Sequence, residues 1–364
     1  MFSAADQEYM SQALRLAEQG LYTATPNPRV GCVIVRDGKI VGEGWHARAG
    51  EPHAEILALR QAGASAKGAT LYVTLEPCNH YGRTPPCTDA LIEFGVGRVV
   101  AAMPDPNPLV AEEGLKKLQI AGIRVTSGLL HREARELNKG FVARMTRGTP
   151  WLRLKTASSL DGKTALNNGV SQWITGAVAR KDVHHWRACS CAILTGIGTV
   201  LADDPLLNVR DVDTTRQPTR VVLDSRLRMP PSAKILAGGN VIIVTAVQDQ
   251  ARREKLQAKG AEVLVLAGVS GRVDLKRAME MLAGRGINEV MAEAGCTLNG
   301  ALIAANLVDE LLMYMAPMLL GDKARAMFDL PELTAMNGRR EFNVRDARMV
   351  GRDVRICARL SDEE

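Results

Sequence analysis

The first 130 residues alternate between two hydrophobic periods. Apolar residues recur every three to four positions in four segments, which predicts helices over 6–19, 54–63, 87–95 and 112–122. Short apolar runs between them predict strands over 30–35, 39–46, 69–77, 96–103 and 123–129. An Asp-Gly pair at 37–38 predicts that the first two strands form a hairpin. Since the later strands are joined through helices, we expect an α/β fold with a largely parallel sheet and ligand sites at strand ends.

Residues 138–150, NKGFVARMTRGTP, have a weaker apolar period, so we expect the boundary here, between domains 1–147 and 148–364. After it the pattern restarts. It predicts strands over 151–160, 192–200, 219–225, 240–246, 261–267, 287–295 and 310–320. It predicts helices over 179–189, 275–286 and 296–308, and one or two antiparallel strands in the tail, around 342–349 and 353–360.

Composition narrows the class of protein. The 364 residues, 46% of them hydrophobic, suffice for two domains with their own cores. The net charge of +6 is spread over both halves and aromatic residues make up 4%, which suits a protein that handles small anions and argues against a nucleic-acid partner. The N-terminus lacks the pattern of a signal peptide, and the longest apolar run, 311–320, is half the ~20 residues of a membrane-spanning helix. We therefore expect a cytoplasmic protein with no membrane partner.

The seven cysteines are too irregularly spaced, and odd in number, for a disulfide framework. Two of them, Cys78 and Cys87, flank the stretch NHYGRTPP, and PHAE at 52–55 opens a predicted helix. One imidazole (His53) and two thiolates form a zinc set that leaves the fourth tetrahedral position open. Zinc lowers the pKa of a bound water to about 7, which supplies a nucleophile at neutral pH. Glu55 is then suited to take the proton of that water and hand it to a leaving amine.

Less specific interpretations compete with this one. A lone HAE is common, two cysteines nine apart are more often unrelated buried residues, and His80 inside the loop is a candidate fourth ligand of a structural zinc site. The combination is more specific. An H-x-E at a helix start, a strand that ends in Pro-Cys and a further cysteine on the next helix form the signature of zinc nucleobase deaminases. The long spacing departs from the commonest form of that signature, in which the cysteines are C-x-x-C.

The stretch PCNHYGRTPPC, with TPNPRVGCVIV and AGEPHAE upstream, resembles the deaminase half of the bifunctional riboflavin-biosynthesis deaminase/reductase family. KTASSLDGKTA (155–165), SQWIT (171–175) and TVLADDPLLNVR (199–210) resemble its reductase half, so the resemblance spans essentially the whole chain. It implies a cytidine-deaminase-like three-layer domain followed by a dihydrofolate-reductase-like domain. It also implies one Zn²⁺ and NADPH as cofactors.

The resemblance implies a small phosphorylated pyrimidine as the first substrate, 2,5-diamino-6-ribosylamino-4(3H)-pyrimidinone 5′-phosphate. Asn27 and His46 match substrate-side residues of the family, and Arg83 takes its basic position in the loop, suited to the 5′-phosphate. Without the resemblance, Asn27 is as readily a turn residue, His46 a surface residue at a strand end and Arg83 a solvated loop charge.

In the second half, AEAGCTLNGA (292–301) predicts a strand, a glycine loop and a helix start that suits a pyrophosphate, although the dinucleotide fingerprint G-x-G-x-x-G is absent. The resemblance assigns the cofactor side to Ala157, Trp173, Thr199, Asp203, Ser225, Gly295, Cys296, Thr297, Leu298, Asn299, Gly300 and Ala301. It assigns the substrate side to Ser171, Arg187, Leu207, Arg210 and Glu293.

We expect Arg187 and Arg210 to form a phosphate clamp, and Ser225, with Arg226, to meet the 2′-phosphate of NADPH. The plainer alternatives are a core residue for Trp173, a helix cap or turn residue for Asp203, and a solvated charge for Arg226. Glu293, Lys155 and a water stay open as proton donors for the reduction.

HHWRACSC (184–191) also holds two His and two Cys, but adjacent residues on a helix point about 100° apart, so we take this cluster as structural. Two other functions remain to be tested. A nucleic-acid deaminase, such as a tRNA adenosine deaminase, would leave the second half unused, and a structural zinc protein would have no need of Glu55. The sequence leaves open whether the chain forms a homo-oligomer.

Overall fold

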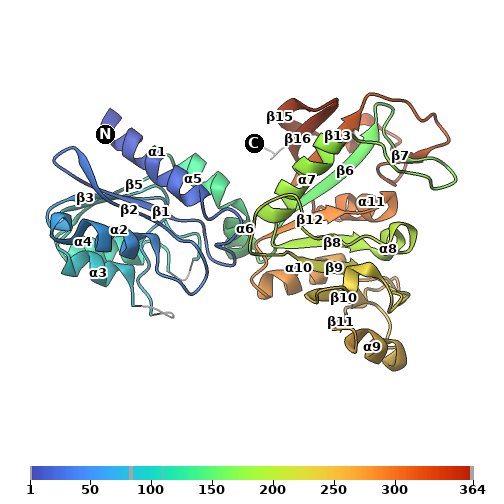
Figure 1. Ribbon diagram of the computed structural model, residues 1–364, viewed down its shortest axis with the longest axis horizontal. Coiled ribbons are helices and arrows are strands. Elements are labelled where there is room, and N and C mark those ends of the chain that lie inside the picture. Colours follow the sequence, from blue (N-terminus) through green and yellow to red (C-terminus); the bar gives the residue numbers. More distant parts are fainter. Residues whose placement is uncertain (1, 82–84, 109, 361–364) are drawn as a thin grey trace. The chain divides into compact units, whose positions relative to one another are not determined.

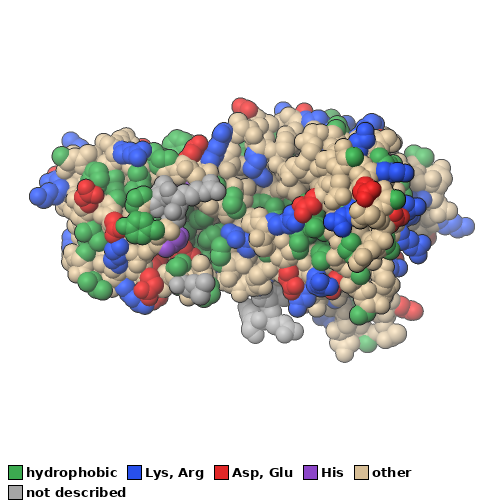
Figure 2. Space-filling view, turned by 90° about the horizontal axis from the view of Figure 1, so that it is seen from below, with side chains coloured by type: hydrophobic (Ala, Val, Ile, Leu, Met, Phe, Trp, Pro, Cys, Tyr) green, Lys and Arg blue, Asp and Glu red, His purple; other side chains and the backbone are tan. Residues whose placement is uncertain are grey.

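The computed structural model describes residues 2–81, 85–108 and 110–360. The chain forms two compact units, residues 1–149 and 150–364, which are described here one at a time. No helix within the described residues is both long and apolar enough to cross a lipid bilayer. On the face of the molecule drawn in Figure 2, Lys and Arg side chains are interspersed with Asp and Glu.

The first unit has three layers, in which helices cover both faces of a five-stranded sheet (Figure 1). Its strands are β1 (Gly31–Arg36), β2 (Lys39–Trp45), β3 (Thr70–Val73), β4 (Arg98–Ala101) and β5 (Arg124–Ser127). Its helices are α1 (Ala4–Glu18), α2 (Ala54–Ala62), α3 (Cys87–Glu93), α4 (Glu113–Ile120), α5 (His131–Leu137) and α6 (Lys139–Arg147), with a 3-10 turn at Gly63–Ala66. Helices α1 and α5 lie on one face of the sheet, and α2, α3 and α4 on the other.

The sheet has the order β2-β1-β3-β4-β5. β1 pairs antiparallel with both β2 and β3, whereas β3, β4 and β5 are parallel. The prediction of a largely parallel sheet is therefore wrong for this unit, because the hairpin and its return connection make half of the pairings antiparallel. Asp37 and Gly38 both have positive φ, 51° and 72°, as a two-residue hairpin turn requires.

Small residues allow the helices to pack closely on β1 and β2. A Cβ on Gly31 would lie 1.9 Å from the carbonyl oxygen of Ala13 in α1, and one on Gly44 would lie 2.4 Å from that of Ala54 in α2. The first turn of α2 is thus fixed against the sheet by backbone contact. This matters because His53 and Glu55 lie at that helix start.

The second unit is built on a nine-stranded sheet. Its strands are β6 (Trp151–Ser159), β8 (Ala192–Gly196), β9 (Thr219–Leu223), β10 (Val241–Thr245), β11 (Ala261–Val265), β12 (Glu289–Glu293), β13 (Glu310–Ala316), β15 (Phe342–Val350) and β16 (Asp353–Leu360). Its helices are α7 (Ala177–Cys189), α8 (Ile197–Asp203), α9 (Gln250–Gln257), α10 (Leu275–Gly284) and α11 (Cys296–Ala304). β7 (Lys163–Ala165) and β14 (Arg325–Ala326) form a separate pair, and 3-10 turns lie at Lys234–Leu236 and Met336–Gly338.

The large sheet has the order β11-β10-β9-β8-β12-β6-β13-β16-β15. All pairings from β11 to β13 are parallel, and β13-β16 and β16-β15 are antiparallel, as expected from the tail. Alternate residues of the strands enter two separate cores. One core lies against α7, α8 and α9, and the other lies against α10 and α11.

A buried arginine holds the middle of this sheet. Arg153 on β6 is 2% exposed and forms ion pairs with Glu310 on β13 and Glu289 on β12. Its guanidinium carbon lies 4.4 Å from the ring centre of Trp186 on α7. Because a buried charge needs partners, the three adjacent strands are joined by charge as well as by backbone hydrogen bonds.

Three segments differ from the sequence-based expectation. Residues 197–200, expected to continue a strand, belong to α8 (Ile197–Asp203), because Gly196 ends the strand as the N-cap residue of this helix. Residues 131–147 form α5 and α6, in which a polar composition obscures the helical period. Residues 250–257 form α9, which begins at an Asp249 cap that accepts the Arg252 N–H.

Candidate active sites

Three candidate metal ligands converge in the first unit. His53 is the N-cap residue of α2, Cys87 is the first residue of α3, and Cys78 follows β3. The sulfur atoms of Cys78 and Cys87 lie 3.5 and 3.3 Å from Nδ1 of His53, and the three donor atoms lie within 4.8 Å of one another. One nitrogen and two sulfurs at this separation fit a tetrahedral zinc ion with one position left open. Within the described residues this is the one such group, and the exposed His80 is not part of it.

The two cysteines differ in their surroundings. The backbone N–H of Cys87 donates to Sγ of Cys78 over 3.3 Å. A hydrogen bond from the Cys87 thiol, together with His53, lowers the pKa of Cys78 well below that of a free thiol. Cys78 is therefore held as a thiolate, which is the form that ligates a metal.

Glu55 lies beside this group and is 3% exposed. Burial, and then the negative charge of Cys78, raise the pKa of Glu55 from 4.5 to about 7. A carboxyl group with a pKa near neutrality can both accept and donate a proton at working pH. The site thus places a proton carrier next to a zinc-type donor set.

His46 and Asn27 extend the site away from the metal ligands. His46 is 3% exposed, so the alternative of a surface residue at a strand end is wrong for it. Its Nδ1 lies 3.3 Å from the carbonyl oxygen of Pro52, and its Nε2 lies 3.0 Å from the amide nitrogen of Asn27. Burial lowers the pKa of His46, so the neutral ring donates from Nδ1 and accepts the Asn27 N–H at Nε2. The His46 ring also meets the His53 ring edge-on, with 5.3 Å between ring centres.

One cavity of about 520 Å³, a size in the range of small-molecule sites, is lined by Asn27, His46, His53, Glu55 and Cys78. Its wall comes from the loop around Asn27, the segment 46–55, the strand end at 75–80, the residues Asp105, Asn107 and Val110, and helix α6. Arg83, predicted to bind the phosphate, lies outside the described residues.

Sequence reasoning missed Glu76, which lies in the same wall and is 5% exposed. Its carboxylate accepts four backbone N–H groups, from Asp105, Glu112, Gly114 and Leu115, over 2.8–3.3 Å. It thereby holds the start of α4 and the loop that presents Asp105 and Asn107 to the cavity. The sequence does mark Glu76 in one way, because it is a carboxylate at the end of an apolar strand, directly before Pro-Cys.

The candidate reductase site lies at the carboxyl ends of β6, β12 and β8, which are neighbours in the second sheet. Glu293 ends β12, and its carboxylate accepts two N–H groups from Arg187 on α7, over 2.6 and 3.0 Å. Lys155 Nζ, from β6, lies 3.8 Å from the same carboxylate. Burial alone would raise the pKa of Glu293, but Arg187 and Lys155 hold it at about 2. Burial lowers the pKa of Lys155.

The predicted substrate-side residues Leu207 and Arg210 lie in the loop after α8. Leu207 is buried, and Arg210 is exposed. The guanidinium groups of Arg187 and Arg210 both donate to Asn208, one to its carbonyl oxygen and the other to its side-chain oxygen. The two arginines of the predicted clamp therefore meet at one residue, but Arg187 is also paired with Glu293. Ser171 lies at intermediate exposure in the loop before α7.

The HHWRACSC segment (184–191) contacts the loop that holds Arg210. His184 is buried, and its Nδ1 accepts the backbone N–H of Arg210 over 3.2 Å. His185 Nε2 lies 3.7 Å from Sγ of Cys189, one helical turn further on. Neither histidine belongs to a group of candidate metal ligands within the described residues.

The predicted cofactor-side residues lie at the same end of the sheet. Gly295 is the N-cap residue of α11, and Cys296 to Ala301 form its first turns. No side chain caps this helix start, and an uncapped helix start offers N–H groups to an anion. Gly196 ends β8 and is the N-cap residue of α8, which contains Thr199. A Cβ on Gly196 would lie 3.3 Å from Leu298 of α11, so the starts of α8 and α11 lie side by side. Ala157 lies on β6, opposite Tyr314 of β13.

The remaining cofactor-side residues lie in loops or at a helix end. Trp173 is 66% exposed, so the alternative of a core residue is wrong, and Arg180 stacks on its ring at 4.4 Å. Asp203 is exposed at the end of α8. Ser225 follows β9, and its Oγ accepts the Val273 N–H over 3.0 Å.

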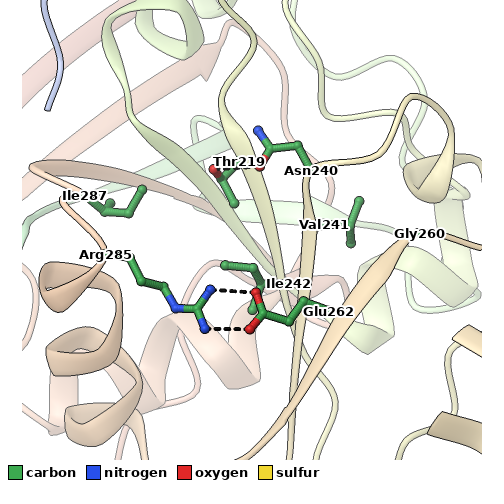
Figure 3. A pocket seen from close by; sticks show the side chains of 8 residues that line it. All are labelled: Thr219, Asn240, Val241, Ile242, Gly260, Glu262, Arg285 and Ile287. Carbon is green, nitrogen blue, oxygen red and sulfur yellow. Dashed lines mark hydrogen bonds and ion pairs between the residues drawn. The ribbon is translucent and has the colours of Figure 1, made fainter. Parts of the chain in front are cut away.

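A second hollow of about 310 Å³ lies at the opposite, amino ends of β9, β10 and β11 (Figure 3). Arg285 and Glu262 face each other across it with two hydrogen bonds of 2.5 and 2.6 Å. Ligands of open α/β sheets bind at the carboxyl ends of the strands, and no predicted site residue lines this hollow. It is therefore a surface crevice closed by an ion pair.

Two family models match separate parts of the chain. Residues 3–103 match the family model of the cytidine and deoxycytidylate deaminase zinc-binding region, and residues 150–356 match that of the RibD C-terminal domain. The chain is 51% identical to the riboflavin biosynthesis protein RibD of Escherichia coli K12 over 96% of this chain and 98% of that protein. It is 48% identical to the RibD of Haemophilus influenzae over 98% and 97% of the two chains.

Two solved structures are similar over 98% of this chain and 99% of their own. Acinetobacter baumannii RibD, in its form 2, is 46% identical with a TM-score of 0.91. A diaminohydroxyphosphoribosylaminopyrimidine deaminase/5-amino-6-(5-phosphoribosylamino)uracil reductase from Thermotoga maritima is 32% identical with a TM-score of 0.86.

Proposed function

The chain belongs to the bifunctional RibD family of riboflavin biosynthesis, and from this premise we propose how its two units divide the chemistry. It is a deaminase and a reductase, with a cytidine-deaminase-like domain followed by a dihydrofolate-reductase-like domain, as predicted. We assign deamination to residues 1–147 and reduction to residues 148–364. The observation that supports this most directly is the buried Glu55 beside the convergent donors His53, Cys78 and Cys87.

The proposed first substrate is 2,5-diamino-6-ribosylamino-4(3H)-pyrimidinone 5′-phosphate, which loses its 2-amino group. His53, Cys78 and Cys87 would hold the zinc ion, which supplies an activated water. Glu55 accepts the proton of this water as its oxygen bonds to C2 of the ring. Glu55 then donates the proton to the 2-amino group, which leaves as ammonia with the electrons of the C2–N bond. The remaining hydroxyl proton moves to the adjacent ring nitrogen, so that C2 gains a carbonyl. Asn27 and His46 bind the base and the ribose, and Arg83 binds the 5′-phosphate.

In the second reaction bound NADPH would supply a hydride to C1 of the ribosyl group. The bond between C1 and the ring oxygen breaks and that oxygen takes up a proton, which gives the ribityl chain of 5-amino-6-ribitylaminouracil 5′-phosphate. The start of α11 suits the pyrophosphate of the cofactor, and Ser225 suits its 2′-phosphate. Arg210 and Arg187 bind the substrate phosphate. Glu293, held ionised by its two cationic neighbours, accepts hydrogen bonds from substrate hydroxyl or amino groups.

A coupled assay tests this assignment. The purified protein is loaded with zinc and given the diaminopyrimidine phosphate and NADPH, and ammonia release and NADPH oxidation are followed together. We expect one NADPH oxidised for each ammonia released, and no ammonia from tRNA. Ammonia from tRNA but not from the pyrimidine would favour the nucleic-acid deaminase. Location in the cytoplasm and a homo-oligomeric state stay predictions.

A further inference from the structure

The wall of the deaminase cavity contains one unused arginine. Arg144 lies in the last turn of α6, is half-buried, and lines the cavity together with Phe141, one turn earlier on the same helix. Its guanidinium carbon lies 5.7 Å from the centre of the Phe141 ring. Among the described residues that line the cavity, Arg144 is the one lysine or arginine, whereas Glu51, Glu55, Glu76 and Asp105 are acidic.

A phosphorylated substrate needs a cation in such a cavity. A phosphate monoester carries a charge of about −1.5 to −2 at neutral pH, and acidic side chains and thiolates around the metal ligands repel it. The guanidinium fork matches two phosphate oxygens at once and stays charged at any working pH.

The order of residues along the wall matches the order of groups in the proposed substrate. His53 and Glu55 lie where the ring must react. His46 contacts His53 and accepts from Asn27, and the Arg144 guanidinium donates to the carbonyl oxygen of Pro26, the residue before Asn27, over 3.3 Å. Arg144 is therefore separated from the reacting centre by the His46–Asn27 pair, as the phosphate is separated from the ring by the ribose.

We propose that Arg144, in addition to the loop cation predicted at Arg83, binds the 5′-phosphate of the deaminase substrate and selects phosphorylated over dephosphorylated pyrimidines. This inference rests on the proposed deaminase function. Contact with the Phe141 ring and the Pro26 carbonyl holds the guanidinium in place, so little side-chain freedom is lost when a phosphate binds.

The test compares two substrates in three zinc-loaded proteins, the wild type, Arg144→Ala and Arg147→Ala. Arg147 is a matched control, because it lies on the same helix but does not line the cavity. For Arg144→Ala we expect kcat/KM of ammonia release from the 5′-phosphate to fall roughly 10- to 100-fold, as for loss of hydrogen bonds to a charged group. With the dephosphorylated nucleoside form we expect less than about a threefold change, and Arg147→Ala should leave both values near those of the wild type.

Either of two results with Arg144→Ala overturns the inference. An equal loss with both substrates means that Arg144 acts on the fold of the wall, and an unchanged value with the phosphate means that it does not contact that group. Arg144→Lys keeps the charge but not the guanidinium fork, so it should recover part of the preference for the phosphorylated substrate. If it recovers none of this preference while its zinc content and melting temperature match those of the wild type, phosphate binding by Arg144 is also refuted. If the wild type releases no ammonia from either substrate, the proposed function itself is wrong, whatever the variants do.

Discussion

The two candidate active sites each contain a nearly buried glutamate, and the surroundings move the two pKa values in opposite directions. Glu55 lies among thiols in the first unit, and burial and Cys78 raise its pKa to about 7. Glu293 lies between Arg187 and Lys155 in the second unit, and these cations outweigh its burial and hold its pKa at about 2. Burial is therefore not what distinguishes the two residues; the charge of the nearest neighbours is.

The difference indicates two uses of one side chain. A carboxyl group that titrates near neutral pH suits the transfer of a proton between water and a leaving amine. A carboxylate that stays ionised suits the binding of donors and the placement of Arg187. The two sites are also built from different elements. The site in the first unit takes its residues from the starts of helices α2 and α3, whereas the site in the second unit lies at the ends of neighbouring parallel strands.

The largest expected effect comes from removal of a metal ligand. Cys87→Ser should abolish both zinc binding and deamination, because three donors are the whole of the set, and should leave NADPH binding and reduction of the deaminated intermediate unchanged. Zinc content by metal analysis and NADPH affinity by fluorescence check this, with Cys189→Ser, a buried cysteine of the second unit, as the control that keeps its zinc. Loss of NADPH binding in Cys87→Ser would show that the two sites are not independent.

Glu55→Gln should lower kcat of deamination by roughly 10²–10⁴-fold, the usual contribution of a general acid–base group, while zinc content stays the same. Ammonia release and metal analysis on the same sample measure the two effects. Glu93→Gln, on the exposed side of α3, is the matched control and should match the wild type. Unchanged turnover in Glu55→Gln would remove this residue from the mechanism.

Glu293→Gln should impair the second unit alone. Breaking a buried ion pair leaves Arg187 and Lys155 without their counter-charge, which should lower the free energy of unfolding at pH 7 by on the order of 3 kcal/mol. Because the pKa of Glu293 is lowered, this stability is present above pH ~4.5 and is lost as the pH falls toward 2, so the variant and the wild type should converge in acid. Reduction of the deaminated intermediate should weaken, and deamination should not.

Denaturant unfolding between pH 3 and 8 measures this difference. The control is Glu262→Gln, which removes the ion pair to Arg285 at the opposite end of the sheet (Figure 3). That pair is exposed, so its loss should cost less than about 1 kcal/mol. An equal cost for both variants would mean that the burial of Glu293 adds nothing.

The smallest effect is expected at Glu76. Glu76→Gln keeps one acceptor oxygen but loses the charge that four N–H groups share, so it should lower the free energy of unfolding of the first unit by roughly 1–3 kcal/mol. It should raise the KM of the deaminase substrate more than it lowers kcat, because the loop of Asp105 and Asn107 moves while Glu55 does not. Thermal unfolding and initial rates measure both, and a change in kcat alone would place Glu76 closer to the chemistry than the structure does.

Periodicity predicted the order of most helices and strands because each has one apolar face or a short apolar run. It failed where composition and period disagree. In 192–200 the β-branched residues favour a strand, yet Gly196 caps a helix there. The pairing within the first sheet was also hidden, because a period of two or 3.6 says which residues face a core but not which strands are neighbours.

The same limit applies to the sites. His53, Glu55 and the two cysteines form a local pattern, so the candidate zinc site could be named from sequence. The contact of Lys155, Arg187 and Glu293 depends on the order β8-β12-β6, which is not sequential, and no spacing predicts it. Glu76 was missed because its partners are backbone N–H groups, which carry no sequence signal.

The place of β6 in its sheet has a consequence for synthesis on the ribosome. It is made first in its unit, but its two neighbours, β12 and β13, begin at Glu289 and Glu310. At ~5–20 residues per second, the nascent chain carries Arg153 without Glu310 for roughly 8–30 s. The preceding unit has all five of its strands by then. Ribosome-bound chains that end before residue 289 should therefore resist protease over the first 149 residues and be cut beyond them, and only chains extended past β13 should gain protection of the rest.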